Sequence, residues 1–251
     1  MKAKLYRNID LVRIPIKAGI SEYYFPQNVD WAAEKIDRIA VCLPTNPCVD
    51  PFDGTTPVLT SASAPDLYFN IYSADQREIL HAVNAEQLWH RNNHGLAIDS
   101  ALDLSLCSMY FSTAPAADAT LLLYIYHGTR EDDVDMAERS VTVEFPLQAG
   151  EQISLQQVIA EYIHALPSKV KGVIFWSGII APAYFTLRNF RQTYVLQNLH
   201  SELARPSMNG GWAGGTQMDP MLFDNIDIDF YYSTIRNADT QANTQKITFL
   251  Y

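Results

Sequence analysis

An eight-residue stretch occurs twice in this chain. "VRIPIKAG" runs from Val12 to Gly19, and "VEFPLQAG" runs from Val143 to Gly150, 131 positions later. Val, Pro, Ala and Gly are identical in the two octets, and two further positions exchange one apolar residue for another. If the similarity extends beyond the octet, it limits the possible folds severely, because a duplicated domain has to fold in the same way twice.

The similarity does extend further along the chain. Four more pairs of segments recur in the same order: "KIDRIAVCLP" (35–44) with "KVKGVIFWSG" (169–178), "YFNIYS" (68–73) with "YFTLRN" (184–189), "SMYFST" (108–113) with "DFYYST" (229–234), and "TLLLYIY" (120–126) with "QKITFLY" (245–251). The offsets drift between 116 and 134 residues, as insertions and deletions in loops produce. A period this long is the size of a small domain and exceeds that of a solenoid repeat.

We therefore predict two related domains, at residues 1–130 and 140–251, with an acidic linker at 131–139 between them. The octet is expected to open the first strand of each domain. Residues 140–147 alternate between apolar and polar side chains, which is typical of a half-buried strand. "GVIFWSGII" and "TLLLYIYHG" are continuous apolar runs, which predict strands that are buried on both faces. The apolar tail "KITFLY" predicts a paired final strand.

Helices are expected only in the connections between strands. The spacing of apolar residues predicts a helix over Leu155–Leu166, with Ser154 and Gln157 forming a capping box. A shorter equivalent is predicted around 29–37, and a second helical site in each domain at 75–91 and 191–205. In "ALDLSLCSMYFST" the alternation changes phase, which we interpret as a β-bulge, with a helical start as the alternative. The fold class is mainly β with short helices in connections, arranged as two tandem jelly-roll or β-sandwich domains.

Composition narrows the possible partners and the cellular compartment. The net charge of −10 argues against a broad nucleic-acid interface, since phosphates would be repelled. Charged residues make up only 18%, and a surface poor in charge indicates coverage by protein partners. Cys42, Cys48 and Cys107 are expected to be buried or free thiols, although Cys42 and Cys48 flank a turn across which they could pair. We see no signal peptide and no membrane-spanning run, and expect a reducing compartment.

No segment carries a recognisable catalytic motif. His90 and His94 have the spacing of a metal-binding pair, but the neighbouring Asn and Gly residues favour a polar helix end. The acidic segments "CVDPFDGTTP" and "EDDVDMAE" offer carboxylates for calcium but lack the EF-hand pattern, so solvated loops are the preferred interpretation. "GGWAGG" lacks the Lys-Ser/Thr of a phosphate-binding loop. We expect no catalytic, cofactor-binding or metal-binding residues, and no enzymatic activity.

The tandem duplication, the domain size and the domain order resemble the double jelly-roll major capsid proteins of tailless icosahedral DNA viruses and phages. The resemblance implies a structural virion protein, made in the host cytoplasm, that forms homotrimers of nearly hexagonal outline. It also implies contact with other coat proteins, proximity to an internal membrane and no sequence-specific binding of nucleic acid. As interface residues we select Trp212 in "GGWAGG" and Tyr231 and Tyr232 in "DFYYST".

Two alternatives remain open at this point. The chain would also suit a tandem β-sandwich binding protein that recognises glycans or proteins, such as a fibre or spike component. A duplicated jelly roll is also similar to bicupin enzymes, whose metal site uses a strand-borne His-x-His. This chain contains no His-x-His, so the enzyme is the third hypothesis.

Overall fold

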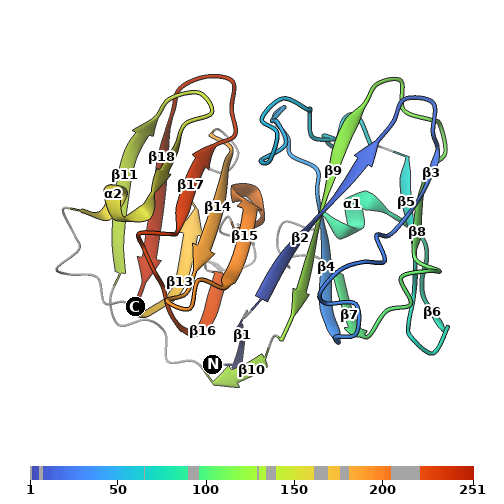
Figure 1. The fold of residues 1–251 in the computed structure, drawn as a ribbon, viewed down its shortest axis with the longest axis horizontal. Coiled ribbons are helices and arrows are strands. Elements are labelled where there is room, and N and C mark those ends of the chain that lie inside the picture. The colour runs from blue at the N-terminus through green and yellow to red at the C-terminus, as the bar shows by residue number, and fades with distance from the viewer. Residues whose placement is uncertain are drawn as a thin grey trace, which may run out of the picture. The chain divides into compact units, whose positions relative to one another are not determined.

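The computed structural model describes residues 2–5, 8–64, 66–89, 96–128, 130–133, 140–160, 169–175, 181–204 and 221–251. The chain divides into two compact units (Figure 1). The N-terminal unit is Leu11–Gly128, and the C-terminal unit is Thr129–Tyr251 together with Met1–Asp10. Within the described ranges, no helix is both long enough and apolar enough to span a membrane.

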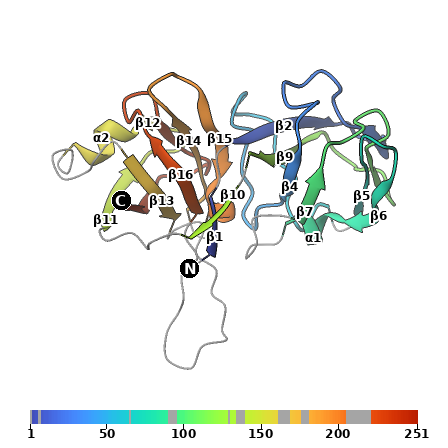
Figure 2. The ribbon, with the colours of Figure 1, turned by 90° about the horizontal axis from the view of Figure 1, so that it is seen from below.

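The N-terminal unit contains two layers of four strands. One layer has the order β2 (Asn8–Ile16), β9 (Ala119–His127), β4 (Ile36–Cys42) and β7 (Leu96–Ser100). The first three residues of β2 belong to the C-terminal unit, where Ile9 pairs in parallel with Leu196. The other has the order β3 (Glu22–Tyr24), β8 (Ser108–Phe111), β5 (Leu67–Tyr72) and β6 (Glu78–Asn84). A one-turn helix, α1 (Ala85–Leu88), lies against β4 and the β5–β6 hairpin (Figure 2).

The C-terminal unit repeats this arrangement. One layer has the order β11 (Ser140–Leu147), β18 (Asn243–Leu250), β13 (Lys169–Phe175) and β16 (Met221–Asp227). The other has the order β12 (Gln152–Ser154), β17 (Thr234–Asn237), β14 (Ala183–Arg188) and β15 (Tyr194–His200). Two short helices, α2 (Leu155–Ile159) and η1 (Ser201–Ala204), follow β12 and β15. A small ladder pairs β1 (Lys2–Leu5) with β10 (Arg130–Asp133) in antiparallel register.

The strand order is the same in both units. If the eight strands of each unit are counted along the chain, one layer reads 1-8-3-6 and the other reads 2-7-4-5. An eight-stranded double sheet with this long-range pairing is a jelly roll. The predicted fold class is therefore confirmed as mainly β with two β-sandwich units.

The duplication is also visible in individual backbone angles. Gln76 and Gln192 occupy the same place in the β5–β6 and β14–β15 hairpins, with φ of 63° and 61°. Ala82 and Asn198 lie six residues later in the same two hairpins, with φ of 48° and 46°. Non-glycine residues rarely adopt positive φ. Two such angles recurring at a constant offset of 116 residues are a strong sign that the two units are copies.

A hydrogen bond between distant segments recurs in the same way. In the N-terminal unit the backbone N–H of Tyr72 donates to Cys107 Sγ at 3.4 Å. In the C-terminal unit the N–H of Arg188 donates to Ser233 Oγ at 3.0 Å. A thiol in one unit and a hydroxyl in the other thus accept the equivalent backbone hydrogen bond.

The repeated octet ends the first strand and forms the turn after it, rather than opening that strand as expected. β2 ends at Ile16 and β11 at Leu147, and Gly19 and Gly150 follow in turns with φ of 79° and 67°. A Cβ added at either glycine would meet no atom within 4 Å. Backbone conformation, and not lack of space, therefore explains why glycine recurs at this place.

The core follows the predicted apolar runs. All nine residues of β9 are buried, as expected for a strand covered on both faces. β18 pairs with β11 on one side and β13 on the other, so the apolar tail is paired as predicted. Phe175 on β13 and Phe185 on β14 meet edge-to-face at 4.8 Å and link the two layers of the C-terminal unit. The three cysteines are buried thiols.

Most of the predicted helices are wrong. The segments 75–91 and 191–205 form mainly the hairpin strands β6 and β15, with α1 and η1 only at their ends. Residues 29–37 form turns that lead into β4. Pairing with β5 and β14 supplies these strands with backbone partners, and this outweighs the local preference for a helix. The capping box of Ser154 and Gln157 is present, and α2 follows it as Leu155–Ile159, with the rest of the predicted helix outside the described residues.

Two further expectations need correction. The change of phase near Leu104 is a turn between Asp103 and Cys107, where we predicted a bulge. Its counterpart in the C-terminal unit is the turn that starts at Asp229, so "DFYYST" corresponds to residues 103–108 and not to "SMYFST". Strand β10 includes residues 131–133 of the segment that we predict as a linker.

Candidate interaction surface

Two neighbouring loops of the C-terminal unit expose a group of aromatic side chains. The β14–β15 hairpin turn carries Phe190, which is 60% exposed, and Tyr194, which is 37% exposed. The loop between β16 and β17 carries Tyr231 and Tyr232, which are 63% and 51% exposed. We call these four residues the aromatic patch. Exposed aromatic groups of this kind mark interaction sites on protein surfaces.

Asp229 holds the two loops together. Its backbone N–H donates to the carbonyl of Arg188 at 2.8 Å, and Gln192 Nε2 donates to Asp229 Oδ2 at 2.9 Å. Asp229 Oδ1 accepts the backbone N–H groups of Tyr231 and Tyr232 at 3.1 and 3.4 Å. One carboxylate therefore fixes the turn that points both tyrosines outward.

An inward-facing aromatic residue anchors the same loop. The ring of Phe230 packs edge-to-face on Phe249 of β18 at 6.2 Å, and its carbonyl accepts the N–H of Gln156 at 3.0 Å. The loop is thus attached to the core at Phe230 while the next two residues face solvent. A surface built in this way loses little conformational entropy when it binds a partner.

Three of the four rings of the patch contact a neighbouring side chain. Tyr231 and Tyr232 meet edge-to-face at 4.9 Å, and the guanidinium of Arg188 lies 4.1 Å from the centre of the Tyr194 ring and also contacts the Tyr194 hydroxyl. Asn189 accepts the N–H groups of Arg191 and Thr193 and the Thr193 hydroxyl. Because these polar side chains already bond within the loops, the surface offers mainly ring faces and arginine.

The predicted interface residues have different outcomes. Tyr231 and Tyr232 lie side by side in the exposed patch, and their role in an interface stays a prediction. Trp212 lies outside the described residues. Phe190 and Tyr194 are not among the predicted interface residues. Tyr194 falls within the segment 191–205 for which we predict a helix, and Phe190 directly precedes that segment. The match of "YFNIYS" with "YFTLRN" could have indicated the position of these two residues, because both segments lead into a hairpin turn.

The same corner of the N-terminal unit is built differently. Ala74, Glu78, Ser105 and Leu106 occupy the positions equivalent to Phe190, Tyr194, Tyr231 and Tyr232. In place of a patch there is an open hollow of about 260 Å³, lined by Gln27, Ala32, Ala74, Leu102, Asp103, Leu104 and Ser105. The hollow is smaller than the roughly 300–1,000 Å³ of typical small-molecule sites.

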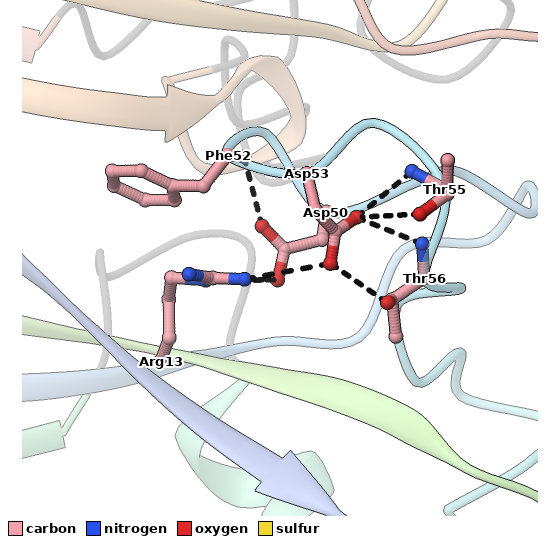
Figure 3. Close-up of polar contacts among 6 residues, drawn as sticks. All are labelled: Arg13, Asp50, Phe52, Asp53, Thr55 and Thr56. Carbon is pink, nitrogen blue, oxygen red and sulfur yellow. Dashed lines mark hydrogen bonds and ion pairs between the residues drawn. The ribbon is translucent and has the colours of Figure 1, made fainter.

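A second polar cluster lies in the long β4–β5 loop of the N-terminal unit (Figure 3). Asp50 is fully buried, and its Oδ2 accepts hydrogen bonds from Arg13 Nε at 2.8 Å and Arg13 Nη2 at 2.6 Å. Asp50 Oδ1 accepts the N–H of Phe52 at 2.8 Å, and the guanidinium lies 4.8 Å from the centre of the Phe52 ring. This ion pair ties the loop to strand β2.

The carboxylates of that loop are used internally. Asp53 accepts the backbone N–H groups of Thr55 and Thr56, both at 2.8 Å, and these bonds lower the pKa of Asp53 far below its usual range. Asp50 is buried and paired, so the expectation of a fully solvated acidic loop is wrong at this residue. Over the described part of the chain, no three His, Cys, Asp or Glu residues gather in a metal-binding arrangement. His90 and His94 lie outside that part.

Comparison with known proteins gives few similarities. No protein-family model and no curated protein matches the chain. A chain from the atomic structure of Sulfolobus Turreted Icosahedral Virus is 11% identical, with 97% of this chain and 90% of that chain covered and a TM-score of 0.22. The major capsid protein P2 of bacteriophage PM2 is also 11% identical, with 99% and 96% covered and a TM-score of 0.23. Both TM-scores are low, so the assignment of each unit as a jelly roll rests on its own strand order.

Proposed function

We propose that the chain is a structural subunit of a virus shell, a double jelly-roll capsid protein that assembles as trimers. The observation that carries the proposal is the identical 1-8-3-6 and 2-7-4-5 strand order of the two units. Jelly rolls occur in capsid proteins, lectins and cupins. Two whole copies in one chain favour the first of these, because a lattice needs several similar contact surfaces on one subunit.

The symmetry of the proposed trimer explains why two similar units in one chain are useful. Three chains that each contribute two similar units produce a ring of six, so a three-fold assembly has a nearly hexagonal outline and tiles a sheet. The units are related but unequal, which allows neighbouring trimers to meet through different contacts. The role is therefore structural rather than catalytic, with the virion as its place and other coat proteins as its partners.

Composition supports a shell subunit in two ways. Only 18% of residues are charged, which suits a surface largely covered by neighbours. The net charge of −10 disfavours direct binding to nucleic acid, as is appropriate for an outer shell subunit that does not read sequence.

A tandem binding protein for glycans or other proteins is the second candidate. The exposed aromatic patch favours it, because tyrosine and phenylalanine rings provide binding platforms. Such a protein would work as a monomer or small oligomer with one specialised unit.

Size-exclusion chromatography with light scattering tests the proposal. A capsid subunit is expected to elute as a species of three times the 28.3 kDa chain mass and to form sheets or shells visible by negative stain at high concentration. Since the chain is strongly acidic, added salt should promote assembly by screening repulsion between copies. A monomer that persists at all concentrations and binds glycans on an array would reject the capsid function and support the second candidate.

A further inference from the structure

We infer that the aromatic patch of one chain docks onto the hollow beside Ala74 of a second copy of the same chain. The inference rests on the proposed self-assembly and names the surfaces that would carry it. Phe190, Tyr231 and Tyr232 supply the projecting side, and the hollow of the N-terminal unit supplies the receiving side.

The jelly roll itself does not require the patch. The same turns in the N-terminal unit keep the Asp103 carboxylate bond that Asp229 makes, yet Ala74 and Ser105 replace Phe190 and Tyr231. The fold is therefore equally possible without exposed rings at these positions. At these four positions the N-terminal unit exposes one large apolar side chain, Leu106 at 40%, whereas the C-terminal unit exposes four aromatic ones. The cost of exposing the four rings together is explained if a partner covers them.

The hollow offers complementary chemistry. Its lining includes the apolar side chains of Ala32, Ala74, Leu102 and Leu104, and its volume of about 260 Å³ is below that of a typical small-molecule site. The hollow is shallow, and its lining also includes the polar side chains of Gln27, Asp103 and Ser105, so it suits a tyrosine, which has an apolar ring and a polar hydroxyl. Aromatic residues seated in such pockets are the usual centres of protein interfaces.

Charge also matches across the proposed contact. Arg188 and Arg191 flank the patch, whereas Asp103 lines the hollow. The whole chain carries −10, so two copies repel each other unless they meet through locally opposite charges. A glycan is less suitable as the occupant, because Asp229, Asn189 and Gln192 already bond within the loops.

The contact is heterologous, since a patch on one copy meets a different surface on the next. Such contacts repeat from copy to copy and close into a ring when the rotation between copies allows it. Closure after three copies would give the trimer of the proposed function.

Site-specific cross-linking tests the contact directly. The native cysteines are buried, so the double variant Ala74→Cys/Tyr232→Cys presents two accessible thiols for a short bis-maleimide. We expect covalently linked dimers and trimers under denaturing conditions, with little linkage in either single variant. Abundant dimers of Tyr232→Cys alone, or linkage only within one chain, would overturn the inference.

Variants of each surface provide the second test. Phe190→Ala/Tyr232→Ser is expected to weaken self-association at least about 30-fold, the loss typical of buried aromatic hot spots. Ala74→Arg is expected to weaken it as well, because the new side chain fills the hollow and its charge repels Arg188 and Arg191. Tyr24→Ser is the matched control, because Tyr24 on β3 is 59% exposed and lies outside both surfaces. Circular dichroism and thermal melting should show that all variants remain folded.

The outcomes separate this inference from the proposed function. A wild-type trimer that survives all patch and hollow variants rejects the docking and leaves the capsid function standing. The docking is also rejected if patch variants stay trimeric but lose binding to liposomes or glycans, because the patch then serves another partner. A wild-type chain that never associates rejects both.

Discussion

Replacing Arg13 by methionine removes two side-chain hydrogen bonds to the buried carboxylate of Asp50. Methionine keeps the apolar stem of the side chain but lacks both nitrogens that donate to Asp50 Oδ2 at 2.8 and 2.6 Å. The Asp50 carboxylate, which is fully buried, would keep the N–H of Phe52 as a donor. Breaking a buried ion pair from one side typically costs about 3–5 kcal/mol. Because the Arg13 side chain is 38% exposed, water can partly replace it, and we expect a loss of about 2 kcal/mol.

The N-terminal unit contains a matched control for this variant. Lys17 forms an ion pair with Asp118 at 2.7 Å, but both side chains are more than half exposed. Lys17→Met is therefore expected to change the free energy of unfolding far less than Arg13→Met does. Asp50→Asn should cost less than Arg13→Met, because it removes the buried charge and leaves a guanidinium that water can reach.

Urea unfolding measures these differences, and hydrogen exchange locates them. In Arg13→Met, amide protection should fall first in the β4–β5 loop, where the N–H of Gly54 donates to the Asp50 carbonyl and the N–H of Asp50 donates to the Thr56 carbonyl. The reasoning is refuted if Arg13→Met shifts the unfolding midpoint no more than Lys17→Met does. It is also refuted if Asp50→Asn is the more damaging of the two changes at this ion pair.

Three further predictions concern single residues. Gly150→Ala and Gly19→Ala should each lower the free energy of unfolding by about 1–2 kcal/mol, because alanine is strained at positive φ. Urea unfolding measures the loss, and an unchanged free energy of unfolding at either site would contradict the assigned turns. Burial raises the pKa of the Cys107 thiol to about 11, so a maleimide at pH 8 should modify it only on unfolding, and rapid labelling of native protein would contradict this. Burial lowers the pKa of His200 to about 3, so between pH 6.5 and 3 only the unfolded chain gains this proton. The free energy of unfolding therefore falls by up to about 1.4 kcal/mol for each pH unit below pH 6.5. Urea unfolding at pH 7 and pH 5 should show a smaller fall in the free energy of unfolding for His200→Gln than for wild type. Equal falls in the two proteins would refute the role of His200.

The sequence predicted the strands better than the hairpins. Residues 140–147 and the apolar run of β9 carry their burial pattern locally, so their strand character is readable without a structure. Residues 78–84 are strand only because β5 lies beside them, and residues 194–200 only because β14 does. Their local composition favoured helices, and partners from a neighbouring strand decided otherwise.

The candidate surface was predicted only in part for a similar reason. Tyr231 and Tyr232 are adjacent in sequence, and an aromatic pair in a polar segment is visible in the letters alone. Their proximity to Phe190 depends on the bonds of Asp229 to Arg188 and Gln192, 41 and 37 positions earlier in the chain. Contacts between residues so far apart in the chain leave no local pattern in the sequence.

The sequence by itself predicted that one domain occurs twice, because two copies of a fold keep similar buried strands and turn glycines in the same order. It also established the β class, because side-chain alternation is a local property of a strand. The tertiary structure alone decided that each copy is a jelly roll, since the pairing of the first strand with the eighth joins residues more than 90 positions apart. It alone placed aromatic rings on one copy and a hollow on the other, because these surfaces form only when distant loops meet.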